Sequence, residues 1–150
     1  MQWNPKEDGI THINVYSKGK TELGKWLSNF TKTPIETEDG YFESIEGYWY
    51  WLGTNHERKD ELRHVSGWQA KSLGREIKSE DWQSSDDFKR KICAAITIKI
   101  NSNSKMLLAL KENTLPLTHY YVYGENHQNP KVIEPKDGRW IIEFMNGFSS

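Results

Sequence analysis

The longest regular pattern in the chain, over residues 84–103, most strongly constrains the fold. Ser85 can cap the start of a helix, and Asp86 and Asp87 favour the positive end of its dipole. The apolar residues then recur on one face at helical spacing: Phe88, Ile92, Ala95 and Ile96. Lys99 lies almost three turns after the first of them. The pattern therefore predicts a long helix with a cation on its core-facing stripe.

Two other interpretations of this region stay open. Residues 96–100 also alternate between apolar and polar, and as a strand they would turn Lys99 toward water. In the helix, the Lys99 stem could also lie on the stripe while its ammonium group reaches solvent.

The rest of the chain shows short strand and helix signals. Before the long helix we expect strands at 11–16, 33–37 and 41–42, a loop or helical turn at 24–30, and helices at about 45–53, 57–66 and 67–77. After it we expect a helix at 104–113, strands at 118–124 and 132–134 around a turn at 126–131, and a helix at 137–147. This order predicts an α+β domain, with several helices around a small, mostly antiparallel sheet.

Composition limits the class of protein. A length of 150 residues fits one domain, and a formal net charge of -1 argues against tight non-specific binding to nucleic acid. Cys93 is the only cysteine, stands among apolar residues and is expected to be buried. The chain has no long apolar run, so we expect a soluble, cytoplasmic protein with no membrane partner.

The segment over residues 43–53 places a carboxylate beside a stripe of rings. Ser44 is a plausible helix cap, and Ile45, Trp49 and Leu52 fall on one apolar face. Glu46 and Tyr50 lie on the neighbouring face, one turn apart. Partial burial there would raise the pKa of Glu46 toward the range useful in acid–base chemistry. A solvated glutamate on a helix surface is the simpler alternative.

Familiar cofactor and metal motifs are absent from the sequence. It has no glycine-rich phosphate loop and no serine-hydrolase elbow, and its five histidines have no close ligand spacing. We therefore expect neither a cofactor nor a metal ion.

Residues 27–51 carry a more specific signal. The segment "LSNFTKTPIETEDGYFESIEGYWYW" resembles the opening signature of the NADAR, or YbiA-like, family. The matching positions are Ser28, Asn29, Phe30, Pro34, Ile35, Phe42, Ser44 and Glu46. The segment "AKSLGREI", a tryptophan at Trp82 and a basic residue at Lys99 extend the resemblance, which covers about residues 12–147.

The resemblance implies hydrolysis of an N-glycosidic bond. The implied substrates are ADP-ribose derivatives, including ADP-ribosylated guanine either free or within DNA, and phosphoribosyl intermediates of riboflavin synthesis. Cleavage of a ribosyl C–N bond builds positive charge on the sugar, which a carboxylate at Glu46 would stabilise. The predicted substrate-binding residues are Asn29, Phe30, Tyr50, Arg75, Trp82 and Lys99, with Lys71 one turn before Arg75 on the same helix face.

Several of these binding residues also have a purely structural interpretation. Asn29 could bond its own turn, Trp82 could be a core ring, and Lys71 with Arg75 could be a solvated face. The strand tyrosines Tyr120 and Tyr121 point to opposite faces, so at most one of them can line a pocket.

The chain also departs from the family pattern. Gly47 stands where the usual member has histidine, and the usual acidic segment near the carboxyl terminus is absent. Glu125, Glu134 and Asp137 are equal candidates to replace the missing acid. A module that binds ADP-ribose or a signal nucleotide without cutting it, and a partner-binding protein with a decayed site, are the alternative functions.

Overall fold

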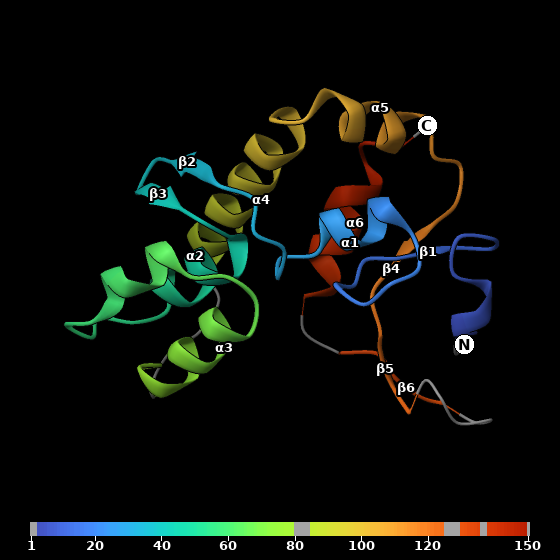
Figure 1. Cartoon of the computed structure of the whole chain (residues 1–150). Helices are drawn as coiled ribbons and strands as arrows, with labels where there is room; N and C mark the ends of the chain where they lie inside the picture. Colours follow the sequence, from blue (N-terminus) through green and yellow to red (C-terminus); the bar gives the residue numbers. More distant parts are fainter. Residues whose placement is uncertain (1–2, 80–84, 125–129, 136–137, 150) are drawn as a thin grey trace. The chain divides into compact units, whose positions relative to one another are not determined.

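The chain forms two compact units. Residues 1–28 and 105–150 make the first unit, and residues 29–104 make the second. The computed structural model describes residues 3–79, 85–124, 130–135 and 138–149. Within them, helices accompany three two-stranded sheets, which confirms the α+β class (Figure 1). The expected single domain over 1–150 stays a prediction, because compact units can fold together or separately.

The first unit is built on short strands and three helices. Its elements are η1 (Pro5–Glu7), β1 (Ile13–Asn14), α1 (Glu22–Leu27), α5 (Ser104–Glu112), β4 (Leu117–Thr118), β5 (Tyr121–Tyr123), β6 (Lys131–Ile133) and α6 (Arg139–Asn146). β1 pairs with β4 in parallel, and β5 pairs with β6 antiparallel. Apolar side chains from these elements are buried, namely Ile13, Leu27, Leu110, Leu117, Ile141 and Met145.

The predicted strand over 118–124 is wrong as one element, because Asn14 interrupts it. The Asn14 side-chain amide donates to the Tyr120 carbonyl, and its Oδ1 accepts the Tyr120 N–H, both at 3.0 Å. These bonds replace the backbone ladder at Tyr120 and separate β4 from β5. The predicted strand at 11–16 likewise shortens to Ile13–Asn14.

The second unit contains one hairpin and the helices around it. Its elements are β2 (Ile35–Thr37), β3 (Gly40–Phe42), α2 (Ile45–Leu52), η2 (Lys59–His64), α3 (Gly67–Glu76) and α4 (Asp86–Asn101). The antiparallel pairing of β2 with β3 confirms the predicted hairpin. The helix expected at 57–66 is instead the shorter 3-10 helix η2.

The long pattern at 84–103 forms α4, so the alternative strand over 96–100 is wrong. The Ser85 hydroxyl accepts the Phe88 N–H at 3.1 Å, as expected of a cap. The predicted apolar stripe is buried along the helix. Lys99 lies on that stripe and is only 1% exposed, so its ammonium group does not reach solvent.

The core face of α2 differs from the predicted one. Tyr48 is fully buried, whereas Trp49 and Leu52 are half-buried. The Tyr48 ring packs on Phe42 with centroids 4.6 Å apart, and its hydroxyl donates to Asp39 Oδ2 at 2.6 Å. The hairpin therefore covers the Tyr48 face of α2, which helical spacing alone could not indicate.

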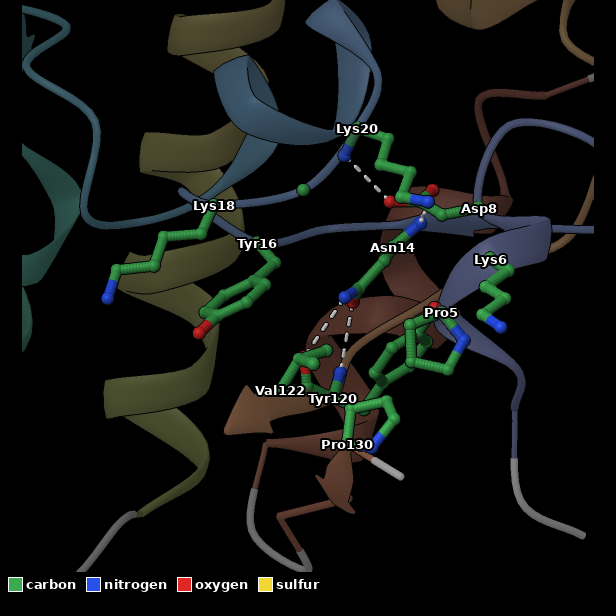
Figure 2. Close-up of a pocket in the computed structure, with 11 residues that line it drawn as sticks. Pro5, Lys6, Asp8, Asn14, Tyr16, Lys18, Lys20, Tyr120, Val122 and Pro130 are labelled. Atoms are coloured by element: carbon green, nitrogen blue, oxygen red, sulfur yellow. Dashed lines mark hydrogen bonds between the residues drawn. The ribbon is translucent and has the colours of Figure 1, made fainter. Parts of the chain in front are cut away.

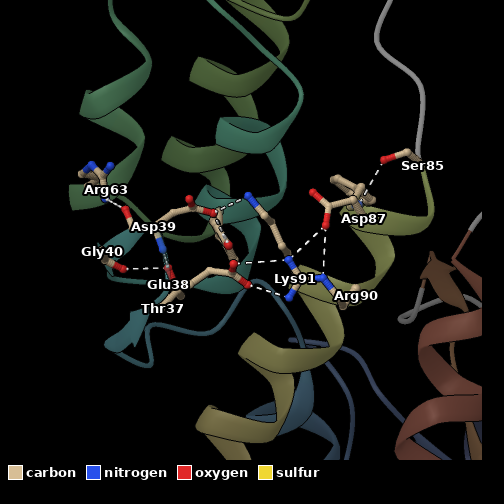
Figure 3. Close-up of polar contacts among 11 residues, drawn as sticks. Thr37, Glu38, Asp39, Gly40, Arg63, Ser85, Asp87, Arg90 and Lys91 are labelled. Carbon is tan, nitrogen blue, oxygen red and sulfur yellow. Dashed lines mark hydrogen bonds and ion pairs between the residues drawn. The ribbon is translucent and has the colours of Figure 1, made fainter.

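Ion pairs and a hydrogen bond connect the hairpin turn to α4 and η2. Figure 3 shows Lys91 of α4 directed at Asp39 and Arg90 directed at Glu38, with nitrogen–oxygen distances of 3.1 and 2.9 Å. Arg63 of η2 donates to the Asp39 carbonyl at 2.8 Å. The three contacts hold the hairpin turn against α4 and η2.

The structure also bears on Cys93 and on the expected lack of a membrane span. Cys93 is half-buried on α4 rather than fully buried, and burial raises the pKa of its thiol. In the described part of the chain, no helix combines the length and apolar character needed to cross a membrane.

Candidate functional site

A short loop at Asn29 and Phe30 connects the starts of two helices in the second unit. The Asn29 carbonyl accepts the N–H of Glu46 in the first turn of α2, at 3.0 Å. The Phe30 carbonyl accepts the N–H of Gly67, the first residue of α3, also at 3.0 Å. The loop thus brings the predicted site residues Asn29, Phe30 and Glu46 close to the start of α3.

Glu46 is held in place by the cap of α2. The Ser44 hydroxyl accepts the Gly47 N–H and donates to the Val65 carbonyl, both at 3.1 Å. This confirms the predicted cap and joins α2 to the segment that leads into α3. Gly47 allows α2 to pack closely on η2, since a Cβ there would lie 2.4 Å from the Leu62 carbonyl oxygen. The departure from histidine therefore has a steric reason in this chain.

Burial raises the pKa of Glu46 from 4.5 to about 7. The positive charges of Lys71 and Arg75 on α3 act against this rise and favour the ionised form. A carboxyl group with such a pKa populates both protonation states near neutral pH, as acid–base chemistry requires.

Tyr50 lies one turn after Glu46 and packs directly on α3. A Cβ at Gly74 would lie 2.1 Å from Cγ of Tyr50, so only glycine lets the ring approach. The Arg75 side chain hydrogen-bonds the Tyr50 side chain. Burial, followed by the charge of Glu46, raises the pKa of Tyr50. The predicted residues Glu46, Tyr50 and Arg75 thus act on one another electrostatically.

An aromatic pair, of which Trp68 is exposed and Phe30 half-buried, adjoins Lys71 of this cluster. The rings of Phe30 and Trp68 meet edge to face with centroids 5.4 Å apart, and Lys71 Nζ lies 5.7 and 5.2 Å from the two centroids. Trp68 is 63% exposed, which is unusual for so large an apolar ring. The sequence-based prediction missed Trp68. Its spacing of three and seven residues before Lys71 and Arg75 could have placed it on their face of α3.

Asn29 adds an unpaired acceptor to the cluster. Its Oδ1 is buried and has no hydrogen-bond partner among the residues that the structure describes. A buried acceptor without a donor is costly, and a ligand hydroxyl could supply that donor.

The remaining predicted positions lie in other segments of the chain or outside the described residues. Lys99 lies near the end of α4, where burial lowers its pKa to about 7. Trp82 lies outside the described residues, as do Glu125 and Asp137. Glu134 is exposed, directly after β6. Over the described ranges, no three His, Cys, Asp or Glu side chains gather into a group suited to a metal ion.

Comparison with known proteins supports the fold. No protein-family model and no curated protein sequence matches this chain. Among solved structures, the chain is similar to the NMR structure of the Escherichia coli protein YbiA, with a TM-score of 0.62 and 17% identity. The likeness covers 97% of this chain and 90% of that one. The chain therefore has a YbiA-like α+β fold.

Proposed function

We propose that the chain is an N-glycosidase of the NADAR, or YbiA-like, family. Its substrate is an ADP-ribose-type nucleotide such as ADP-ribosylated guanine. Two observations support the family: the YbiA-like fold and the motif over residues 28–46 that resembles the family signature. The proposed activity rests on Glu46: burial raises its pKa to about 7, and the positive charges of Lys71 and Arg75 act on its carboxylate. Lys71 Nζ in turn lies 5.2 Å from the ring centroid of the exposed Trp68.

Glu46 would act on the ribosyl carbon. When the C–N bond breaks, its electron pair goes to the base and positive charge develops on the sugar. The ionised carboxylate stabilises this charge. Water then adds to the anomeric carbon and releases a proton, which neutralises the departing base directly or through Glu46.

The surrounding groups suit the other parts of such a substrate. Phe30 and Trp68 offer rings to a nucleobase, and Lys71 and Arg75 offer positive charge to a diphosphate. The buried Oδ1 of Asn29 can accept a hydrogen bond from a ribose hydroxyl. Tyr50 is a further contact, while Trp82 and Lys99 stay substrate contacts on the resemblance alone.

A turnover assay tests the proposal. Pure protein is incubated with ADP-ribosylated guanine, as a free nucleotide and within a DNA oligonucleotide, and released ADP-ribose is measured by mass spectrometry. Glu46→Gln removes the charge while keeping the shape, and we expect it to lower the rate by about 10²–10⁴-fold. Glu57→Gln, at an exposed position in the same unit, is the matched control and should keep full activity.

The alternatives give different outcomes. Equal release by wild type and Glu46→Gln would keep the glycosidase but exclude Glu46 from the chemistry. No release by either protein, with ADP-ribose still raising the melting temperature, would indicate a binding module instead.

A further inference from the structure

The first unit contains a pocket that the proposed glycosidase site does not use. Its volume is about 250 Å³, and it lies between the loop after β1, the η1 segment and the strand β5. Drug-sized ligands occupy pockets of roughly 300–1,000 Å³, so this one suits a single small molecule. Figure 2 shows Tyr16 and Lys18 on one side of it, and Pro5 and Lys6 on the other.

Positive charge predominates in the lining of this pocket. Three lysines contribute to it, Lys6, Lys18 and Lys20, and all three are exposed to solvent. Across the described residues, none of their ammonium groups forms an ion pair or a hydrogen bond. They are therefore available to an anion, at a place where the chain brings three cations together.

The acidic residue in the lining is already engaged. Asp8 is buried, and its two carboxylate oxygens accept the N–H groups of Asn14 at 2.9 Å and Lys20 at 2.8 Å. This carboxylate stabilises the loop after β1 and is not directed at a cationic ligand (Figure 2). Three ammonium groups against one carboxylate leave the pocket with a net positive charge.

The loop that carries two of the lysines is tightly packed. A Cβ at Gly19 would lie 3.0 Å from the carbonyl oxygens of Asn14 and Tyr16. Lys18 and Lys20 flank this glycine, and the Asp8 bond to Lys20 N–H fixes the same loop. The lysines therefore extend from a preorganised backbone, which lowers the entropic cost of binding.

Rings and apolar side chains form the other part of the lining. Tyr16, Tyr120, Val122, Pro5 and Pro130 line the pocket. The Tyr120 hydroxyl bonds His12, and the Tyr120 backbone bonds Asn14, so this floor is held from within. A ligand that fits must pair an anionic group with a flat, weakly polar body.

We propose that this pocket binds a small phosphate ester that carries a ring, with the phosphate on the lysines and the ring against Tyr16 and the prolines. All residues that line this pocket belong to the first unit, whereas Glu46 belongs to the second.

Site-resolved NMR tests the proposal with full-length protein. Adenosine monophosphate is titrated while backbone amide shifts are followed, with inorganic pyrophosphate and uncharged adenosine as separate probes. We expect adenosine monophosphate to shift the amides of Asn14, Gly19 and Lys20. Adenosine should leave them in place, and pyrophosphate should shift them more weakly. Binding at the other unit would move the amides of Gly67 and Lys71 instead, so the two sites are distinguished.

Substitutions complete the test. The double variant Lys18→Gln/Lys20→Gln should weaken binding by roughly tenfold, because it removes two charge-assisted contacts at an exposed site. Lys111→Gln, on the exposed face of α5 in the same unit, is the matched control and should bind as wild type does. Unchanged binding by the double variant, or no shift of the pocket amides at millimolar ligand, would overturn the proposal.

Discussion

Gly74 of α3 faces the ring of Tyr50 so closely that a Cβ at residue 74 would lie 2.1 Å from Tyr50 Cγ. This contact sets how near α3 approaches α2. It therefore also sets how near Arg75 and Lys71 approach Tyr50 and Glu46.

Gly74→Ala should destabilise the protein, although alanine favours helices over glycine by about 1 kcal/mol. The clash with a ring and the resulting shift of α3 cost about 1–3 kcal/mol, which outweighs the gain in propensity. Urea unfolding measures the difference. Ser72→Ala, on the exposed face of the same helix, is the control and should leave stability equal or slightly higher. A Gly74→Ala protein more stable than wild type would contradict the close packing.

Glu46→Gln should change how stability depends on pH. The folded pKa of Glu46 is raised to about 7 from 4.5, so between these values the folded chain holds a proton that the unfolded chain has released. Wild-type stability therefore falls as pH rises from about 4.5 through 7. Glutamine does not titrate, so the variant should be similar to wild type near pH 4 and more stable above pH 7, by on the order of 3 kcal/mol.

Urea unfolding across this pH range measures the Glu46 effect. Glu57→Gln should follow the wild-type curve at every pH, because Glu57 is exposed. A constant difference between Glu46→Gln and wild type would mean that Glu46 is not the group that titrates.

Lys99→Met should change how stability depends on pH over a different pH range from that of Glu46→Gln. Burial lowers the pKa of Lys99 to about 7 from 10.5, so between these values the unfolded chain holds the proton that the folded chain lacks. Wild-type stability therefore rises with pH from about 7 to 10.5. Methionine removes the buried amine, and its advantage should reach a few kcal/mol below pH 7 and shrink toward pH 10.

Thermal unfolding at a series of pH values measures the Lys99 effect. Lys32→Met, at an exposed position in the same unit, is the control and should stay within about 0.5 kcal/mol of wild type throughout. If Lys99→Met loses stability most at low pH, the ammonium group is stabilised in the fold rather than desolvated.

Trp68→Ala should weaken substrate binding with little loss of stability, because the ring is mostly exposed and would stack on a base. Stacking on an aromatic side chain is worth about 1–3 kcal/mol per base, so we expect the dissociation constant to rise about tenfold or more. Binding is measured by calorimetry with ADP-ribosylated guanosine. The proteins compared all carry Glu46→Gln, so that the ligand is bound but not cleaved. Tyr123→Ala, which removes an exposed ring from β5, should bind normally. Unchanged affinity in Trp68→Ala would assign the ring to structure alone.

Features that depend only on neighbouring residues could be predicted from the sequence. The caps at Ser44 and Ser85, the buried stripe of α4 with Lys99 on it, and the β2–β3 hairpin all follow from local spacing, and the structure confirms each. Spacing on α2 also placed Glu46 and Tyr50 on one face.

Long-range packing determines which faces of the elements are covered and which residues meet across them, and the sequence did not predict these contacts. The hairpin buries Tyr48 in place of Trp49, Asn14 divides the strand at Tyr120, and Gly74 lets α3 bring Lys71 and Arg75 within electrostatic reach of Glu46. These outcomes rest on contacts between residues far apart in the chain. Helical and strand periodicity records only which side of an element is apolar, and not which partner will lie against it.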